Sequence, residues 1–212
     1  MPAMDSARIQ QLLQPFLAAP LPEAQLSCVS TYIDLLLRWN AHINLTAVRD
    51  GNNIVTRHFG ESFFAARRLP PTTSLVDLGS GAGFPGLPIK IFHSQIAVTL
   101  IEANHKKATF LREVLRALAL KNTEVFTGRG EDFPAASAGV VTIRAVERFE
   151  NTLPIAARLL APRGTLALLI GSAQVASARQ LLPQLIWQTP VPIPQSSARV
   201  LFLGISTEES KV

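Results

Sequence analysis

The sequence predicts an α/β fold in which a mostly parallel sheet follows an N-terminal helical extension. Three observations support this prediction. In residues 1–70, apolar residues recur at spacings of three and four, which is typical of helices. From residue 74, short apolar runs alternate with helical segments, as in a parallel sheet covered on both faces. A glycine-rich segment, residues 79–86, follows the first of these runs, where such a sheet places a ligand-binding turn.

The N-terminal extension is expected to contain two main helices. The first begins after Pro22 and ends near Trp39–Asn40, and its apolar stripe consists of Leu26, Val29, Ile33, Leu36 and Leu37. The second runs over residues 54–69 and stops before Pro70–Pro71. A polar break, residues 44–53, separates them.

After residue 74 the sequence predicts five strands, three further helices and a final antiparallel hairpin. The expected strands are 75–78, 97–102, 123–127, 140–143 and 164–170. The expected helices are 106–120, 151–160 and 175–185, and the hairpin combines the segment at Ile186 with residues 200–205. We therefore expect an extension over 1–70, one compact domain over 71–207 and a tail over 208–212.

Composition narrows the class of protein. With 212 residues, 48% of them hydrophobic and 17% charged, the chain is expected to be a soluble globular protein with one sizeable core. A single cysteine, Cys28, excludes an intrachain disulfide and a zinc site built on paired thiolates, and we expect no metal. The start of the chain does not resemble a signal peptide, and no apolar run reaches the roughly 18 residues of a membrane span. We expect a cytoplasmic protein without a membrane partner.

The net charge is +5, from 20 Lys and Arg against 15 Asp and Glu. A basic balance favours a polyanionic partner, of which nucleic acid is the common case. Most of the cations in residues 104–121 are expected to form a solvated helix face. Arg144 differs, because it directly follows the fourth expected strand, at the edge of the sheet where reacting groups gather. We treat Arg144, together with Arg57 and His58, as candidate site residues.

Two ligand templates fit the glycine-rich segment. Gly81 to Gly86 matches the dinucleotide pattern GxGxxG, whereas Asp77 to Gly83 matches the acid-x-GxGxG turn of S-adenosylmethionine (SAM) enzymes. A pyrophosphate needs free N–H donors, and both the carboxylate of Asp77 and the missing donor of Pro85 disfavour it. SAM carries no phosphate, and its cationic sulfonium tolerates a nearby carboxylate. The sequence therefore favours SAM, with a nicotinamide-dependent reductase as the alternative.

An acidic residue at the end of the second expected strand supports a ligand that contains ribose. Glu102 lies 23 residues beyond Gly79, where a carboxylate can hold both ribose hydroxyls. SAM and dinucleotides share this requirement, so Glu102 does not separate them. The pair Glu131–Asp132, after the third expected strand, could reach the edge of an adenine.

The absence of several motifs excludes or disfavours certain classes of reaction. No Gly-Lys-Ser/Thr follows the glycines, which excludes a P-loop enzyme, and Tyr32 lacks the partner lysine of short-chain reductases. Cys28 lies in an expected helix far from the sheet turns, which disfavours thiolate attack on a pyrimidine ring. A transferase without a nucleophile favours an acceptor that is already nucleophilic, such as guanine N7. Catalysis would then depend largely on positioning.

Taken in order, these residues resemble the RsmG (GidB) family. The resemblance covers roughly residues 26–170, with a weaker match to the end, and its motifs are Trp39–Thr46, Arg57–Ser62, Asp77–Gly86, Lys106–Arg112, Arg129–Phe133 and Arg144–Ala145. It implies a bacterial SAM-dependent methyltransferase that forms 7-methylguanosine in 16S ribosomal RNA. It also implies a Rossmann-like methyltransferase sheet preceded by helices, so that residues 71–207 would form the SAM-binding methyltransferase domain.

The resemblance also assigns site residues. With Asp77 and Gly81 of the turn, the cofactor residues would be Gly79, Phe84, Glu102, Gly130, Glu131 and Arg144. Asn44, Arg57 and His58 would face the substrate, and Asn44, His58 and Arg144 would be the catalytic candidates. The cofactor would be SAM, converted to S-adenosylhomocysteine. The partner would be 16S rRNA or the small ribosomal subunit, and we expect the protein to act as a monomer.

The chain departs from the family pattern in two strands. Leu169-Ile170-Gly171 stands where the family has Leu-Lys-Gly, and Gly139 and Ile143 stand where it has Asp and Ser. A cation expected beside the RNA is therefore absent at Ile170. These departures leave SAM binding intact and keep two alternatives open, a non-catalytic SAM- or RNA-binding protein and a methyltransferase with another target.

Overall fold

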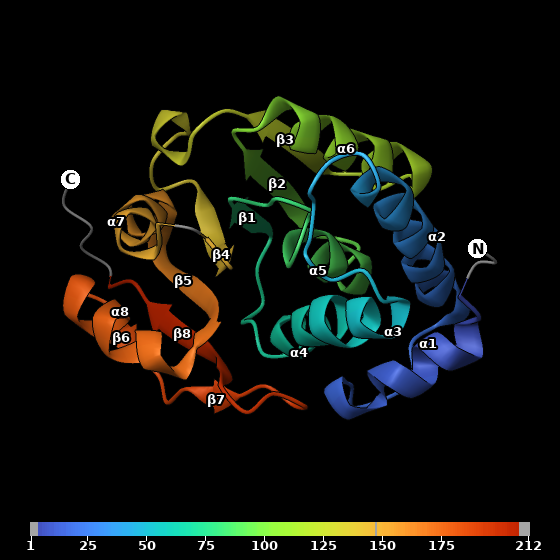
Figure 1. Ribbon diagram of the computed structural model, residues 1–212. Helices are drawn as coiled ribbons and strands as arrows, with labels where there is room; N and C mark the ends of the chain where they lie inside the picture. The colour runs from blue at the N-terminus through green and yellow to red at the C-terminus, as the bar shows by residue number, and fades with distance from the viewer. Residues whose placement is uncertain (1–3, 147, 208–212) are drawn as a thin grey trace.

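The computed structural model describes residues 4–146 and 148–207, and its centre is an eight-stranded sheet (Figure 1). The strand order is β3-β2-β1-β4-β5-β8-β6, with β7 also paired to β8. The first five strands are parallel, whereas β6, β7 and β5 all pair with β8 in antiparallel fashion. The strands are β1 (Ser74–Leu78), β2 (Ala97–Glu102), β3 (Thr123–Thr127), β4 (Ala138–Arg144), β5 (Leu160–Gly171), β6 (Ile186–Trp187), β7 (Val191–Pro192) and β8 (Arg199–Ile205).

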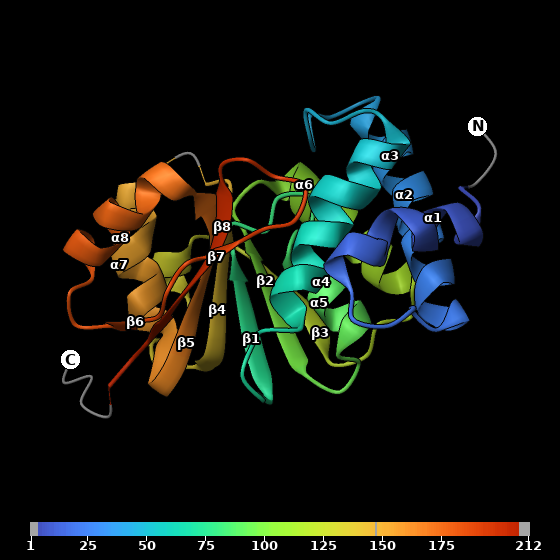
Figure 2. The same ribbon diagram turned by 90° about the horizontal axis from the view of Figure 1, so that it is seen from below.

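Helices cover both faces of the sheet. Figure 2 shows α1 to α6 on one side and α7 and α8 on the other. The helices are α1 (Ser6–Leu13), α2 (Glu23–Asn40), α3 (Gly51–Asn53), α4 (Glu61–Ala66), α5 (Gly86–Phe92), α6 (His105–Ala117), α7 (Phe149–Leu159) and α8 (Val175–Leu181). Short helical turns are η1 (Gln14–Phe16), η2 (Ile54–Gly60, of π type), η3 (Gly130–Asp132) and η4 (Ser172–Gln174). The predicted fold class is confirmed.

Alternation along the strands divides the core into two layers. Leu75 of β1 packs with the N-terminal helices and α5, whereas its neighbour Val76 packs with α7 and α8. This follows from the period of two in a strand, which sends successive side chains to opposite faces. Because both faces are covered, the central strands are apolar almost throughout.

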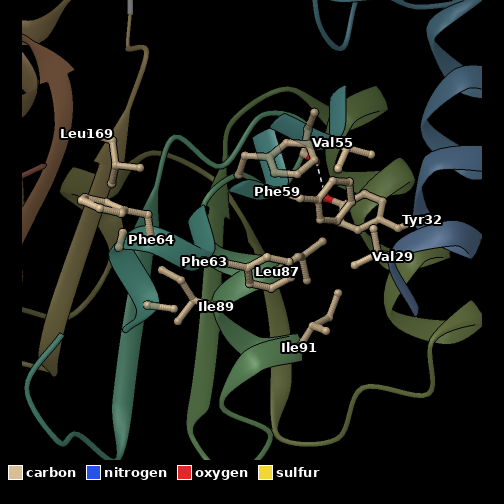
Figure 3. Close-up of a cluster of buried hydrophobic side chains, with 14 of the residues drawn as sticks. Val29, Tyr32, Val55, Phe59, Phe63, Phe64, Leu87, Ile89, Ile91 and Leu169 are labelled. Carbon is tan, nitrogen blue, oxygen red and sulfur yellow. Dashed lines mark hydrogen bonds between the residues drawn. The ribbon is translucent and has the colours of Figure 1, made fainter. Parts of the chain in front are cut away.

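The N-terminal extension shares one hydrophobic core with the sheet. Tyr32 of α2 and Phe59 of η2 meet edge to face at 5.2 Å between ring centroids, and Phe63 of α4 lies beside α5 (Figure 3). Trp39 adds a polar contact, since its Nε1 donates to Glu113 Oε2 of α6 at 3.0 Å. These contacts fix the extension on the sheet and thereby place the segment between α2 and α3, residues 41–50.

The boundaries of several expected elements differ from the structure. The helix expected over 106–120 begins at His105, capped by the Asn104 side chain, and ends at Ala117, because the chain reverses through Ala119 at φ +48°. The stretch expected over 54–69 begins as a π-type turn and ends at Ala66, and α8 ends at Leu181 rather than 185. The expected tail, 208–212, lies outside the described residues.

Candidate active site

The glycine turn between β1 and α5 is shaped by left-handed backbone. Gly79, Gly81 and Gly83 have φ values of +72°, +57° and +87°, which residues with a Cβ rarely adopt. Gly79 N and Ser80 N both donate to the carbonyl of Ile101 in β2, at 3.0 Å. A Cβ on Gly83 would collide with the Tyr32 hydroxyl and with Leu87 Cδ1. The turn therefore needs glycine at this position for close packing.

Aromatic side chains from the extension hold the turn from behind. The buried Tyr32 hydroxyl donates to the carbonyl of Ala82, and its ring stacks on Phe84 with centroids 5.3 Å apart. On its other side Phe84 stacks on His58 at 4.8 Å. Sequence reasoning identified Phe84 and His58 but gave Tyr32 no site role, because Tyr32 lies in an expected helix about 50 residues before the turn. The extension thus supports the turn directly.

A cavity of about 640 Å³ lies between the glycine turn and residues 45–47 of the extension, within the usual range for small-molecule sites. Six of the predicted site residues line it, namely His58, Gly79, Gly81, Phe84, Glu102 and Arg144. The other lining residues are Leu45, Thr46, Ala47, Ser80, Ala82, Lys107, Arg129, Ala145, Val146 and Arg148. The structure therefore brings together segments from β1, β2, β4 and the extension.

Glu102 is held so that its carboxylate faces the cavity. Its Oε2 accepts a hydrogen bond from Gly81 N at 2.8 Å, and its Oε1 accepts one from Asn104 N at 2.7 Å. Each oxygen has two lone pairs, so both can accept a further bond. Two oxygens side by side suit the two adjacent hydroxyls of a ribose. The hydrogen-bond acceptors of Glu102 thus fit the ribose of SAM.

Asp77 lies beneath the turn and does not line the cavity. Its Oδ1 accepts a hydrogen bond from Thr142 Oγ1 of β4 at 2.7 Å, and its Oδ2 has no hydrogen-bond partner among the described residues. A Cβ on Gly86 would lie 2.8 Å from Oδ2, so the carboxylate points at the start of α5. Burial raises the pKa of Asp77 to about 6. Its direct contact with the cofactor stays a prediction.

Replacing Asp77 with asparagine should change how stability depends on pH. A carboxyl whose pKa is about 6 in the folded state, against 3.8 when unperturbed, makes the protein less stable as pH rises through that window. Between pH 4 and pH 8, the free energy of unfolding of wild type should therefore fall by up to about 3 kcal/mol relative to that of Asp77→Asn, as measured by urea unfolding. If the free energies of unfolding of the two proteins changed with pH in parallel across this range, the raised pKa of Asp77 would be contradicted.

A buried ion-pair triad joins the extension to β4 and β8. Glu61 of α4, with a side chain 2% exposed, accepts from Arg199 through Oε1 at 2.6 Å. Its Oε2 accepts from Arg144 Nη2 at 3.3 Å. Arg144 Nη2 also donates to the carbonyl of Arg57 at 2.8 Å. Glu61 escaped sequence reasoning as a site residue, although it lies inside the motif Arg57–Ser62.

His58 connects this triad to the cavity in a single protonation state. Its Nδ1 lies 3.0 Å from Arg144 Nη2, and its Nε2 lies 2.8 Å from Thr46 Oγ1. A guanidinium can only donate, so Nδ1 must accept and the neutral ring carries its proton on Nε2. Burial, and then the charges of Arg144 and Arg57, lower the pKa of His58 to about 3. His58 is therefore neutral at physiological pH.

The neutral state of His58 can be tested by NMR titration. We expect its ring signals to stay unchanged between pH 5 and pH 8, because its pKa of about 3 lies far below this range. The exposed His42 and His105 supply comparison signals in the same spectra. A midpoint near 6.5 for His58 would contradict these hydrogen-bond directions. By linkage, the contribution of His58 to stability is complete above pH 6.5 and declines as pH falls toward 3.

Asn44, predicted as a catalytic and substrate residue, is exposed and does not line the cavity. The buried Asn40 organises this segment instead. Its Oδ1 accepts from Leu45 N at 2.9 Å and from Thr46 N at 3.0 Å, and its Nδ2 donates to the carbonyl of Thr46 at 2.9 Å. Asn40 thus fixes Thr46 at the cavity. Asn40 and Thr46 both lie in the motif Trp39–Thr46, which indicated that this segment belongs to the site but not which of its side chains contribute.

Three other predicted residues lie outside the cavity. Arg57 is exposed and, with Arg199, lines a neighbouring cavity of about 330 Å³. Gly130 is buried and Glu131 exposed, and both belong to η3, whose carbonyls accept hydrogen bonds from Arg158 Nη2. The preceding residue, Arg129, does reach the cavity. The roles of Arg57, Gly130 and Glu131 toward ligands stay predictions.

Among the described residues, three cations line the cavity in addition to Arg144. Lys107, Arg129 and Arg148 line it, and the two arginines are exposed. Ile170, where the family has lysine, is buried in the apolar layer with α7 and α8 instead. The change at Ile170 therefore leaves these cations in place.

Within residues 4–146 and 148–207, no cluster of three metal-ligating side chains occurs. No helix among these residues is long and apolar enough to cross a membrane.

The sheet order and the cavity at the strand ends define a Rossmann-like α/β fold with a ligand site at the carboxyl edge of its parallel strands. Solved structures share this fold. The P. horikoshii TYW2 complex with MeSAdo superposes with a TM-score of 0.59 at 17% identity, covering 70% of this chain and 62% of that one. The M. jannaschii TYW2 complex with AdoMet gives a TM-score of 0.58 at 16% identity, covering 78% of each chain.

The family model for GidB, rRNA small subunit methyltransferase G, matches residues 25–190. A ribosomal RNA small subunit methyltransferase G from Xanthomonas campestris is 44% identical over 66% of each chain. Those from Roseiflexus castenholzii and Chloroflexus aggregans are 40% and 38% identical, covering 85% and 87% of this chain and 83% of each relative. The chain belongs to this family of SAM-dependent methyltransferases. Family membership confirms the resemblance seen in the sequence and argues against a nicotinamide-dependent reductase.

Proposed function

We propose that this protein transfers the methyl group of SAM to N7 of a guanosine in 16S rRNA of the small ribosomal subunit. The observation that carries the proposal is the cavity that joins the Glu102 carboxylate to the paired Arg144 and His58. When bound, SAM supplies an electrophilic methyl group on a sulfonium.

The cofactor residues act by binding and orientation. The glycine turn lets a ligand approach the backbone at Gly79 and Gly81, and Glu102 accepts hydrogen bonds from the ribose. Nη2 of Arg144 lies within hydrogen-bond distance of Arg57 O, His58 Nδ1 and Glu61 Oε2, and its two hydrogens are shared among these three acceptors. The rest of its guanidinium is left to bind an anionic or oxygen-bearing group of the ligand.

The residues that line the cavity suit a methyl acceptor that does not have to lose a proton before it reacts. His58 has both ring nitrogens engaged, and the Glu102 oxygens accept backbone bonds. Neither His58 nor Glu102 is therefore free to act as a general base that removes a proton from the substrate. Guanine N7 carries a lone pair and no proton, so alignment alone can drive its methylation.

The cations that line the cavity suit a polyanionic substrate. Lys107, Arg129 and Arg148 can contact phosphates on either side of the reacting nucleotide. The target guanine would leave its stack to enter the cavity, as in other enzymes that modify a base. An rRNA substrate agrees with the expected cytoplasmic location, and the monomeric state stays a prediction.

The test compares 16S rRNA from cells with and without the gene, after reduction and aniline cleavage, which cuts at 7-methylguanosine. We expect one cleavage product to disappear on deletion and to return with the wild-type gene. Complementation with Glu102→Gln should restore it poorly. An unchanged pattern on deletion would favour the non-catalytic alternative or another target.

A further inference from the structure

We infer that the Thr46 hydroxyl is a hydrogen-bond donor that recognises O6 of the target guanine. This inference rests on the proposed function and adds a specificity-determining residue to it. Thr46 lies in the motif Trp39–Thr46, but the motif alone gives its hydroxyl no role.

The hydrogen bonds around Thr46 follow from the contact between Arg144 Nη2 and His58 Nδ1, read as a hydrogen bond that sets the tautomer of the ring. Arg144 Nη2 can only donate, so His58 Nδ1 accepts and His58 Nε2–H donates to Thr46 Oγ1 at 2.8 Å. Val48 N also donates to Thr46 Oγ1, at 3.1 Å. Both lone pairs of the hydroxyl are therefore occupied. What remains is its proton, which must find an acceptor outside this chain of bonds.

Thr46 is rigidly placed where a substrate can reach it. Asn40 binds both the N–H and the carbonyl of Thr46, at 3.0 and 2.9 Å. Thr46 is half-buried and lines the cavity beside the exposed Ala47, at the rim contributed by the extension. The ribose-binding carboxylate of Glu102 comes from the sheet instead. Thr46 therefore lies on the wall opposite in origin to Glu102, where it is open to a base that enters the cavity.

The chemistry of purines selects O6 as the acceptor. In guanine the N7 lone pair is adjacent to the O6 carbonyl, whereas adenine has an N6 amino donor at that position. A donor to N7 would block the reacting lone pair, but a donor to O6 leaves it free. The same donor faces another donor when adenine enters, and an unmade bond of this kind lowers binding. Thr46 would thus favour guanine and orient N7.

The closing experiment uses 16S rRNA assembled by ligation with either guanosine or 2-aminopurine at the methylated position. 2-Aminopurine keeps N7 but lacks O6. Single-turnover methylation of both RNAs is measured for wild type, Thr46→Val and Thr46→Ser. Calorimetry with S-adenosylhomocysteine is run on each protein, and unfolding curves show whether each variant is folded.

We expect Thr46→Val to lower the rate on guanosine about tenfold and to leave the 2-aminopurine rate nearly unchanged. Thr46→Ser should keep most of the preference for guanosine, and S-adenosylhomocysteine should bind all three proteins alike. Structural damage from removing the acceptor of His58 and Val48 would lower both rates equally, which overturns the inference.

Weaker binding of S-adenosylhomocysteine by Thr46→Val alone would also overturn it, since the hydroxyl would then contact the cofactor. If wild type methylates the guanosine RNA neither as naked RNA nor after its assembly into the small ribosomal subunit, the proposed function itself is wrong. That outcome is distinct from an equal loss on both RNAs, which leaves the function standing.

Discussion

Glu61→Gln is expected to lower the free energy of unfolding by about 3 kcal/mol, a large effect for an isosteric change. The carboxylate of Glu61 is buried and forms ion pairs with both Arg144 and Arg199. Glutamine would leave two partly buried guanidinium groups near each other without a counter-charge. Urea unfolding at pH 7 measures the change.

A matched variant distinguishes the loss of the Glu61 ion pairs from the general effect of removing a carboxylate. Glu150 is exposed in the first turn of α7, so Glu150→Gln should cost less than about 1 kcal/mol. Similar unfolding energies for Glu61→Gln and Glu150→Gln would show that the triad does not hold the extension to the sheet. Salt should weaken the Glu61 effect little, because the pair is buried.

Glu102→Gln should weaken binding of S-adenosylhomocysteine by about 10- to 100-fold. The two carboxylate oxygens accept from Gly81 N and Asn104 N, and both have capacity for ribose hydroxyls. An amide keeps one acceptor and turns the other into a donor that faces a backbone N–H. The substitution therefore disturbs the turn and removes half of the ribose contact. Calorimetry on the purified protein gives the affinity.

Glu131→Gln is the control for this measurement. Glu131 is a predicted cofactor residue, yet it is exposed on η3 and does not line the cavity. We expect its replacement to change the affinity for S-adenosylhomocysteine by less than about threefold. Equal losses for Glu102→Gln and Glu131→Gln would mean that the cofactor extends beyond the cavity toward η3.

The elements of the fold followed from local patterns. Apolar runs located β1 to β5, and the helical stripe located α2, because burial on a regular face leaves a period in the sequence. The ends of α6 and α8 were missed by a few residues. Such ends depend on a single backbone conformation, such as the positive φ of Ala119, which an apolar pattern does not reveal.

The site was predicted only in part. Glycines and strand-end acids carry local signals, so the sequence could point to Gly79, Gly81 and Glu102, which line the cavity. Tyr32, Glu61 and Thr46 were missed, because their roles depend on contacts with residues elsewhere along the chain. Tyr32 bonds to Ala82, and Glu61 pairs with Arg199. Asp77 shows the converse, since its motif is clear but its carboxylate is buried beneath the turn.

The most direct test of the proposed activity combines purified protein, SAM labelled in its methyl group and 16S rRNA from a strain that lacks the gene. After digestion to nucleosides, we predict that the label elutes with 7-methylguanosine and approaches one methyl group per rRNA. Label in another nucleoside would contradict this activity, as would no transfer to either naked 16S rRNA or small ribosomal subunits from that strain by a protein that binds S-adenosylhomocysteine.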